Sequence, residues 1–299
     1  MKLVTYIQRG LERVGFYREA DQCVVPAHEL DLKSTEMNDL IRELDAVSFD
    51  FTACDLSRYK GIPAENVQMI SPIPNPEQDV ICLGLNYHDH ADEAEKASAS
   101  SAYGKRTGNP VYFAKRVSRA VAPGQPVDGH FDIVDSLDYE VELAVVIGKN
   151  ARNIKAVDAE QYILGYTILN DVSARELQTG HTQWYFGKSL DGFTPMGPCI
   201  VTADEIPYPP ALGIRTYVNG EERQNSRTDM LIHSISEIIA SLSRGMTVKA
   251  GSIIATGTPK GVVLGMENMV FLKDGDVGRL EIDGIGELTN TVKNSAGEK

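Results

Sequence analysis

Three acidic side chains interrupt an otherwise apolar stretch at residues 137–147, LDYEVELAVVI. Because side chains alternate between the two faces of a strand, Asp138, Glu140 and Glu142 share one face, and this face becomes apolar further along the chain. A solvent-exposed face is expected to stay polar, so the change favours a strand that enters a pocket. The spacing alone leaves a solvated strand face open as the alternative.

A further acid, Asp171, ends an apolar strand and precedes a predicted short helix. Aspartate at such a position often caps the helix, but Ser173 and Glu176 have the spacing of a capping box and are expected to do so instead. If Asp171 lies beside Glu140 and Glu142, the three carboxylates repel one another unless a cation lies between them. Ligation by oxygen alone favours Mg²⁺ or Mn²⁺ over Zn²⁺.

Other polar groups also have types and spacings that suit chemistry. His90 and Glu93 lie three residues apart, so a helical turn would bring them together, and a histidine held by a carboxylate can act as a general base. A polar surface pair is the alternative for these two residues, and an ordinary surface lysine is the alternative for Lys188. The glycine-rich segment 255–262 and its Thr258 could hold a carboxylate, or could form a plain hairpin turn.

Composition and missing motifs exclude several classes of protein. The chain contains no G-x-S-x-G, H-E-x-x-H or G-x-G-x-x-G pattern, which counts against a serine hydrolase, a zincin and a Rossmann dehydrogenase. A net charge of −13 argues against a nucleic-acid partner. It also means that a small anionic substrate needs a metal or a few well-placed cations in the site.

The cysteines and the N-terminus indicate an intracellular setting. The four cysteines do not form a metal-binding pair or a disulfide framework, so we expect reduced, mostly buried thiols, with Cys199 packing in a strand. The first residues, MKLVTYIQRG, lack the apolar stretch of a signal peptide, and no segment is long and apolar enough to span a membrane. The expected location is the cytoplasm.

The elements that would position these residues fall into two parts. A proline-rich stretch at residues 71–78 predicts a boundary between a small N-terminal α/β domain, residues 1–74, and a larger domain, residues 75–299. Apolar residues at helical spacing predict a helix within 35–47. The small polar stretch 91–108 is expected to be a loop or weak helix that could act as a lid.

The larger part is rich in strand signals and lacks the strand–helix alternation of a doubly wound fold. The Asn219-Gly220 pair predicts a tight hairpin, and a second amphipathic helix is predicted at 234–245. The predicted strands of this part lie at 79–85, 110–115, 139–148, 166–170, 197–202, 214–220, 252–257 and 278–292.

Six stretches, taken in order, resemble the fumarylacetoacetate hydrolase family. They are LGLNYHDHADE, PVYFAK, DYEVELAVVIGK, GYTILNDVSARELQ, QWYFGKSLDGFTPMGP and IIATGTPKGV. The resemblance covers roughly residues 79–290. It implies an α+β, mainly β fold, namely a mixed β-roll, with a bound Mg²⁺ or Mn²⁺ and assembly as a homodimer.

The resemblance also implies roles for nine side chains. The implied metal ligands are Glu140, Glu142 and Asp171, the implied catalytic residues are His90, Glu93 and Lys188, and the implied substrate-binding residues are Arg175, Gln178 and Thr258. The chain departs from the eponymous enzyme because it has a short N-terminal domain and carries Asn86 where that enzyme's motif adds an acidic ligand. It therefore looks closer to the acylpyruvate hydrolase, 2-hydroxyhepta-2,4-diene-1,7-dioate isomerase and oxaloacetate decarboxylase branch.

The resulting hypothesis is hydrolysis of a carbon–carbon bond in a 1,3-diketo acid held on the metal. His90, polarised by Glu93, would take a proton from the attacking water, while Lys188 and Gln178 would stabilise the oxyanion before a pyruvate-type enolate leaves. The same enolate forms when CO₂ leaves, so oxaloacetate decarboxylation stays open, as does isomerisation of a dienoate. A non-catalytic metal-dependent binding module is the alternative of another class, and it would not need His90, Glu93 or Lys188.

Overall fold

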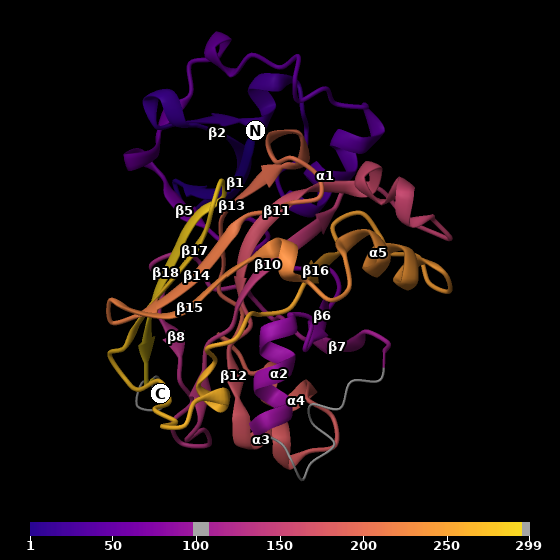
Figure 1. Ribbon diagram of the computed structural model, residues 1–299. Coiled ribbons are helices and arrows are strands. Elements are labelled where there is room, and N and C mark those ends of the chain that lie inside the picture. Colours follow the sequence, from indigo (N-terminus) through magenta and orange to yellow (C-terminus); the bar gives the residue numbers. More distant parts are fainter. Residues whose placement is uncertain (98–107, 295–299) are drawn as a thin grey trace.

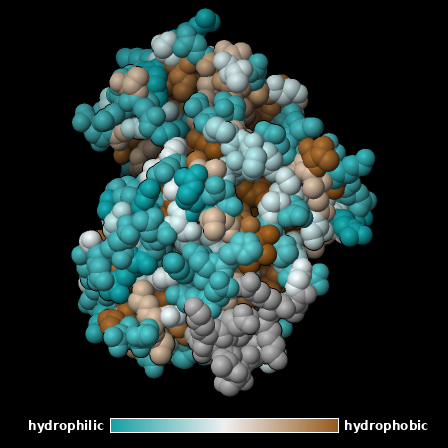
Figure 2. Space-filling view, viewed as in Figure 1, coloured by the Kyte–Doolittle hydropathy of each residue, from teal (hydrophilic) through white to brown (hydrophobic). Residues whose placement is uncertain are grey.

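The structure is a computed structural model that describes residues 1–97 and 108–294. Figure 1 shows a mainly β chain with mixed sheets, which confirms the predicted fold class. Most of the predicted lid, residues 98–107, lies outside the described residues. The face of the molecule in Figure 2 is mostly hydrophilic. No described helix has the length and apolarity needed to span a membrane.

The largest sheet is mixed because β16 pairs antiparallel with β10 and parallel with β6. Its strands, in spatial order, are β4 (Ile62–Pro63), β3 (Cys23–Pro26), β2 (Leu11–Arg18), β1 (Lys2–Gln8), β13 (Met196–Thr202), β11 (Ile163–Asn170), β10 (Val141–Ile147), β16 (Ile253–Ala255), β6 (Val80–Gly84) and β7 (Val111–Lys115), with β5 (Gln68–Ile70) paired to β1.

Two smaller sheets complete the β structure. The strands of the five-stranded sheet are β15 (Glu221–Arg227), β14 (Gly213–Val218), β17 (Val277–Ile282), β18 (Gly286–Lys293) and β8 (Val127–Asp128). The two-stranded sheet pairs β12 (Ser173–Ala174) with β9 (Leu137–Asp138). The predicted hairpin is confirmed between β14 and β15, where Asn219 and Gly220 have φ values of 52° and 85°, as a type I′ turn requires.

The described α-helices are short. They are α1 (Met37–Ala46), α2 (His88–Ala97), α3 (Arg175–Gly180), α4 (Tyr185–Lys188) and α5 (Ile235–Ser243). Both amphipathic helices predicted from apolar spacing are confirmed as α1 and α5, and each buries its apolar face.

The N-terminal strands belong to the same sheet as the strands of the larger part. Strand β1 hydrogen-bonds antiparallel to β13, with Lys2 opposite Val201. In Figure 1 the N-terminal strands lie at one end of the molecule, and α2, α3 and α4 lie at the other. The division into domains 1–74 and 75–299 stays a prediction.

Strand β10 is buried on both faces, as its composition predicts. Val141, Leu143 and Val145 pack in a core with α5 and the five-stranded sheet. Ala144 and Val146 pack on the opposite side, in the core that includes α1. Burying both faces leaves no solvent-facing surface along β10, so the alternative of a solvated strand face is wrong.

The predicted capping box at Ser173 and Glu176 is wrong. Ser173 is extended in β12, where it pairs with Asp138 of β9, and helix α3 begins at Arg175 without a side-chain cap. The Glu176 backbone N–H instead donates to Ser136 Oγ at 2.9 Å. Tertiary pairing of β9 with β12 overrides the local capping signal.

Candidate active site

The buried charged side chains of residues 1–93 and 108–294 gather in one cluster. The members are Asp138, Glu140, Glu142, Asp171, Lys115, Arg175 and Lys188, with His90 beside them. Four acids and three bases give this cluster a formal charge of −1. Burial of charge is costly unless each group is paired, so concentrating it at one place is typical of a functional site.

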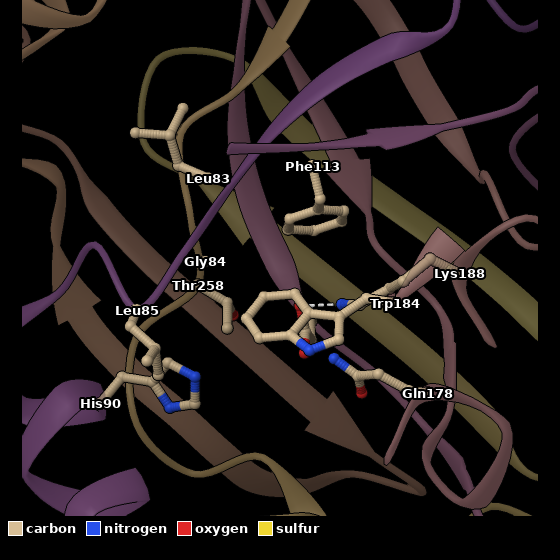
Figure 3. A pocket seen from close by; sticks show the side chains of 10 residues that line it. Leu83, Gly84, Leu85, His90, Phe113, Gln178, Trp184, Lys188 and Thr258 are labelled. Atoms are coloured by element: carbon tan, nitrogen blue, oxygen red, sulfur yellow. Dashed lines mark hydrogen bonds and ion pairs between the residues drawn. The ribbon is translucent and has the colours of Figure 1, made fainter. Parts of the chain in front are cut away.

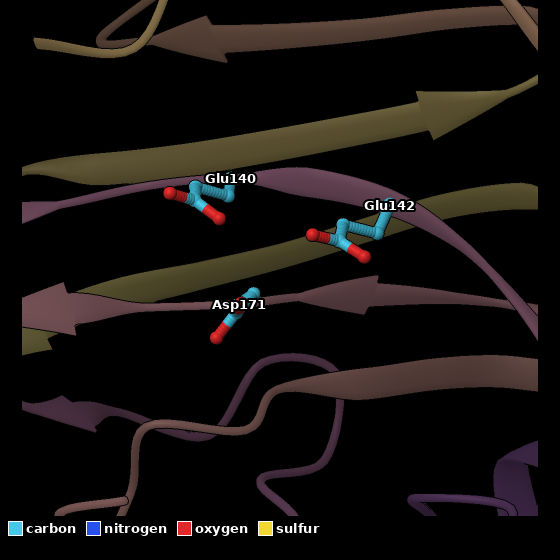
Figure 4. A group of neighbouring side chains, drawn as sticks. All are labelled: Glu140, Glu142 and Asp171. Carbon is cyan, nitrogen blue, oxygen red and sulfur yellow. The ribbon is translucent and has the colours of Figure 1, made fainter. Parts of the chain in front are cut away.

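The three predicted metal ligands converge (Figure 4). Oxygen atoms of Glu140, Glu142 and Asp171 lie within 4.8 Å of one another, and all three residues are buried. The register of β10 and β11 places them there, because Val141 lies opposite Asn170. The Asp171 backbone N–H also donates to the Glu140 carbonyl at 2.9 Å.

Three buried cations neutralise two of these ligands. Lys188 Nζ lies 2.8 Å from both Glu140 Oε2 and Asp171 Oδ2. Lys115 Nζ lies 2.8 Å from Asp171 Oδ1, and Arg175 lies 2.7 Å from Glu140 Oε1. Burial alone would raise the pKa of Glu140, but Lys188 and Arg175 outweigh it and lower that pKa to about 2.

Glu142 differs from its two neighbours because it has no ion pair within the described part of the chain. Its carboxylate accepts a hydrogen bond from the Gly257 backbone N–H at 2.8 Å, and the side chain is 1% exposed. Burial first, and then repulsion from Asp171 and Glu140, raises its pKa well above the usual value. A divalent cation among the three carboxylates would supply the missing charge, and the all-oxygen donor set fits Mg²⁺ or Mn²⁺.

Arg175 lies behind the carboxylates and does not line the pocket. Its guanidinium contacts Asp138 Oδ2 through Nε at 2.8 Å, Glu140, and Gln178 Oε1 at 2.9 Å. Asp138 is fixed in turn by the backbone N–H groups of residues 263 and 264. Through these ion pairs, Asp138 and Arg175 hold Glu140 in position. The predicted substrate contact of Arg175 stays a prediction.

The predicted histidine–glutamate pair lies on helix α2. His90 Nδ1 lies 3.2 Å from Glu93 Oε2, at the i, i+3 spacing of a helix. His90 is 5% exposed, so the alternative of a polar surface pair is wrong. The Gly261 backbone N–H donates to both oxygens of Glu93 at 3.3 Å. Because Glu93 contacts Nδ1 of His90, Nε2 is the ring nitrogen that Glu93 does not engage.

A pocket opens onto these groups (Figure 3). Its polar lining residues are His90, Glu140, Gln178, Lys188 and Thr258, and its remaining lining residues are Leu83, Gly84, Leu85, Phe113 and Trp184. Thr258 Oγ1 accepts a hydrogen bond from Gln224 at 2.8 Å. Four of the six side chains predicted to be catalytic or substrate-binding thus line the pocket, namely His90, Gln178, Lys188 and Thr258.

Several residues of the site were not assigned a role from the sequence. Lys115 could have been found, because it is a charged residue in the otherwise apolar strand PVYFAK. Trp184 and Phe113 gave no signal beyond ordinary apolar character. Asn86, at the position where the eponymous enzyme's motif is acidic, donates to the Thr256 carbonyl at 2.8 Å and lies outside the carboxylate group.

Comparison with known proteins places this site in a family. Residues 79–293 match the family model for the fumarylacetoacetate (FAA) hydrolase C-terminal domain. The oxaloacetate tautomerase of Bacillus subtilis is 44% identical over 226 residues, which cover 76% of this chain and 73% of the relative.

Solved structures share the fold along the whole chain. A fumarylacetoacetate hydrolase from Exiguobacterium antarcticum has a TM-score of 0.83 at 37% identity, covering 98% of this chain and 99% of the other. A maleylpyruvate hydrolase from Sphingobium sp., solved with manganese(II) and pyruvate, has a TM-score of 0.75 at 29% identity, covering 98% and 99%.

Proposed function

The chain belongs to the fumarylacetoacetate hydrolase family of enzymes, and we propose that it acts on small 2-oxo acids through their enol or enolate forms with a divalent metal. The observation that carries the proposal is the convergence of Glu140, Glu142 and Asp171 beside a pocket. A divalent cation would change the formal charge of the buried cluster from −1 to +1. The site would then attract an anionic acid although the whole chain has a net charge of −13.

Each polar side chain of the pocket has a part in this proposal. A divalent cation, when bound by the three carboxylates, supplies Lewis-acid polarisation of the 2-oxo group. His90, held through Nδ1 by Glu93, moves a proton to or from carbon 3 of the acid through Nε2. Lys188 uses two of its three N–H donors on Glu140 and Asp171, which leaves one for the enolate oxygen, and Gln178 supplies a second polar contact.

Oxaloacetate is the substrate that we propose first. A relative named oxaloacetate tautomerase is 44% identical to this chain over 226 residues. Enol-to-keto conversion needs only the loss of the enol O–H proton and the gain of a proton at carbon 3. Decarboxylation of oxaloacetate would instead break the bond between carbons 3 and 4, release CO₂ and leave the enolate of pyruvate. Isomerisation of a dienoate would pass through the dienolate of that acid.

Hydrolysis of a 1,3-diketo acid of the acylpyruvate type is the second candidate, and the His90–Glu93 pair favours it. A buried histidine oriented by a carboxylate can take a proton from water as the water attacks a carbonyl. A structural neighbour is named maleylpyruvate hydrolase and holds pyruvate. In this reaction the bond between carbons 3 and 4 breaks, water supplies the new carboxylate, and pyruvate leaves as its enolate.

Product analysis separates these reactions. The protein, freed of metal by a chelator and reloaded with Mg²⁺ or Mn²⁺, is given oxaloacetate or acetylpyruvate. Loss of enol absorbance without pyruvate indicates tautomerisation, pyruvate from oxaloacetate indicates decarboxylation, and pyruvate with acetate from acetylpyruvate indicates hydrolysis. Glu142→Gln should abolish turnover, whereas the matched surface variant Glu160→Gln should not. Absence of metal-dependent turnover with every acid would refute the enzyme and favour a binding module.

The assembly state is a separate part of the proposal. We propose a homodimer, which the family resemblance implies. Light scattering coupled to size exclusion tests it, and a mass of 32.7 kDa in solution would contradict it.

A further inference from the structure

The apolar side of the pocket is built around a single indole. Trp184, the one tryptophan of the chain, projects into the group of lining side chains (Figure 3). Its ring meets the ring of Phe113 edge-on, with centroids 5.2 Å apart and an interplanar angle of 66°. Trp184 precedes Lys188 by four residues, so one helical turn separates the indole from a cation of the site.

Gly84 provides the seat for this indole. A Cβ atom built on Gly84 would lie 2.4 Å from Trp184 Cζ3 and 2.8 Å from Cη2, so the ring packs directly on the backbone at the end of β6. Gly84 does not have a positive φ, and its backbone conformation therefore does not demand glycine. The absence of a side chain at position 84 leaves the space that the indole of Trp184 occupies.

Lys188 contacts both the apolar side of the pocket and the carboxylates of the site. Its Nζ lies 5.2 Å from the centre of the Phe113 ring, over the face of the ring, and 2.8 Å from Glu140 and Asp171. Phe113 thus contacts both the indole and the ammonium group. A substrate whose oxygens reach Lys188 would have the part of its chain nearest to Phe113 confined by Trp184.

We propose that Trp184 determines substrate size: it limits the group attached beyond carbon 3 of the 2-oxo acid to a small one. The inference rests on the proposed function and names its substrate class, small acids such as oxaloacetate and acetylpyruvate, with aryl-substituted homologues excluded. An apolar pocket wall changes the preference between homologous substrates by about 10–200-fold for each methylene that it accepts or excludes. Removing the indole should therefore be measurable as a change in relative kcat/KM.

The test compares acetylpyruvate with benzoylpyruvate in the metal-loaded, full-length protein. We expect Trp184→Ala to raise the benzoylpyruvate-to-acetylpyruvate ratio of kcat/KM by about 10-fold or more. Gly84→Ala should shift the ratio in the same direction, because it displaces the indole without deleting it. Tyr185→Ala is the matched control, since Tyr185 is the next aromatic residue and is 41% exposed. An unchanged ratio in both Trp184→Ala and Gly84→Ala, with native circular dichroism, would overturn the proposal.

A binding experiment keeps this inference separate from the proposed reaction. Oxamate and N-phenyloxamate are an unreactive small and large pair, and calorimetry with Mg²⁺ gives their dissociation constants in each variant. Wild-type protein should prefer oxamate, Trp184→Ala should lose that preference, and oxamate should change the emission of the single tryptophan. If no acid is turned over but these binding results hold, the proposed reaction is refuted and the size limit set by Trp184 is supported. If the wild type and Trp184→Ala show the same preference for oxamate, the size limit set by Trp184 is refuted.

Discussion

Replacing Glu142 by glutamine is expected to stabilise the metal-free protein while removing its stabilisation by metal. Glu142 is 1% exposed, accepts a hydrogen bond from the Gly257 N–H and lies beside two other carboxylates. An ionised carboxylate in such a place without a cationic partner costs several kcal/mol, part of which is relieved when the group binds a proton. Glutamine keeps an oxygen for Gly257 and removes the charge.

The size of the effect follows from these contacts. Relief of the repulsion should raise the free energy of unfolding of the metal-free protein by about 1–3 kcal/mol, the usual magnitude for one uncompensated buried polar group. For a chain of this size, such a change corresponds to a rise in Tm of roughly 2–5 °C. Metal at 100 times its Kd should stabilise the wild-type protein by about 2.7 kcal/mol and leave Glu142→Gln almost unchanged.

Thermal unfolding with and without Mg²⁺ is the assay, with Glu160→Gln as the control for loss of one surface carboxylate. The order of stability should reverse, because the variant is the more stable protein in chelator and the wild type is the more stable protein in metal. A variant less stable than wild type in chelator would show that Glu142 is already compensated. Equal metal-induced shifts in both proteins would refute the assignment of the metal to these carboxylates.

Three further predictions concern groups around the carboxylates and one helix end. Asp138→Asn should lower the free energy of unfolding by about 3–5 kcal/mol in urea and weaken Mg²⁺ binding by calorimetry, because it leaves Arg175 with one carboxylate partner fewer; unchanged affinity would contradict the positioning role. His90→Ala should keep Mg²⁺ affinity but lower kcat by about 10²–10⁴-fold, and retained turnover would move proton transfer to another group. Hydrogen bonds from the Ser234 N–H and hydroxyl lower the pKa of Glu237. The contribution of Glu237 to stability is therefore present above its unfolded-state pKa and is lost as pH falls through its folded-state pKa. The difference in the free energy of unfolding between the wild type and Glu237→Gln should shrink on acidification, and a constant difference would contradict this.

Local patterns predicted the groups whose neighbours are set by strand or helix geometry. The helical spacing of His90 and Glu93 is confirmed on α2, because it depends on the period of the helix. Glu142 lies in β10 and Glu140 lies one residue before it, and their carboxylates converge as the spacing suggested. The mainly β class followed in the same way from many short β-branched segments between turns.

Groups whose partners come from distant segments could not be predicted in this way. Lys115 of β7 pairs with Asp171, which follows β11, although three strands separate β7 from β11 in the large sheet. Arg175 pairs with Asp138 of another segment. Ser173 failed as a cap for a related reason, since pairing with β9 holds it extended. Resemblance to a family supplied the assignment of roles that spacing left open.

The segment from residue 257 to residue 264 holds three acids of the site by backbone N–H groups alone. These N–H groups donate to Glu142, Glu93 and Asp138. One stretch of main chain therefore contacts a predicted metal ligand, the glutamate that holds His90, and the aspartate that binds Arg175. Hydrogen bonds from the main chain do not depend on which side chains the segment carries, apart from the two glycines with positive φ at 257 and 261. Side-chain substitutions within this segment, the two glycines excepted, would therefore leave the main-chain donors of all three acids in place.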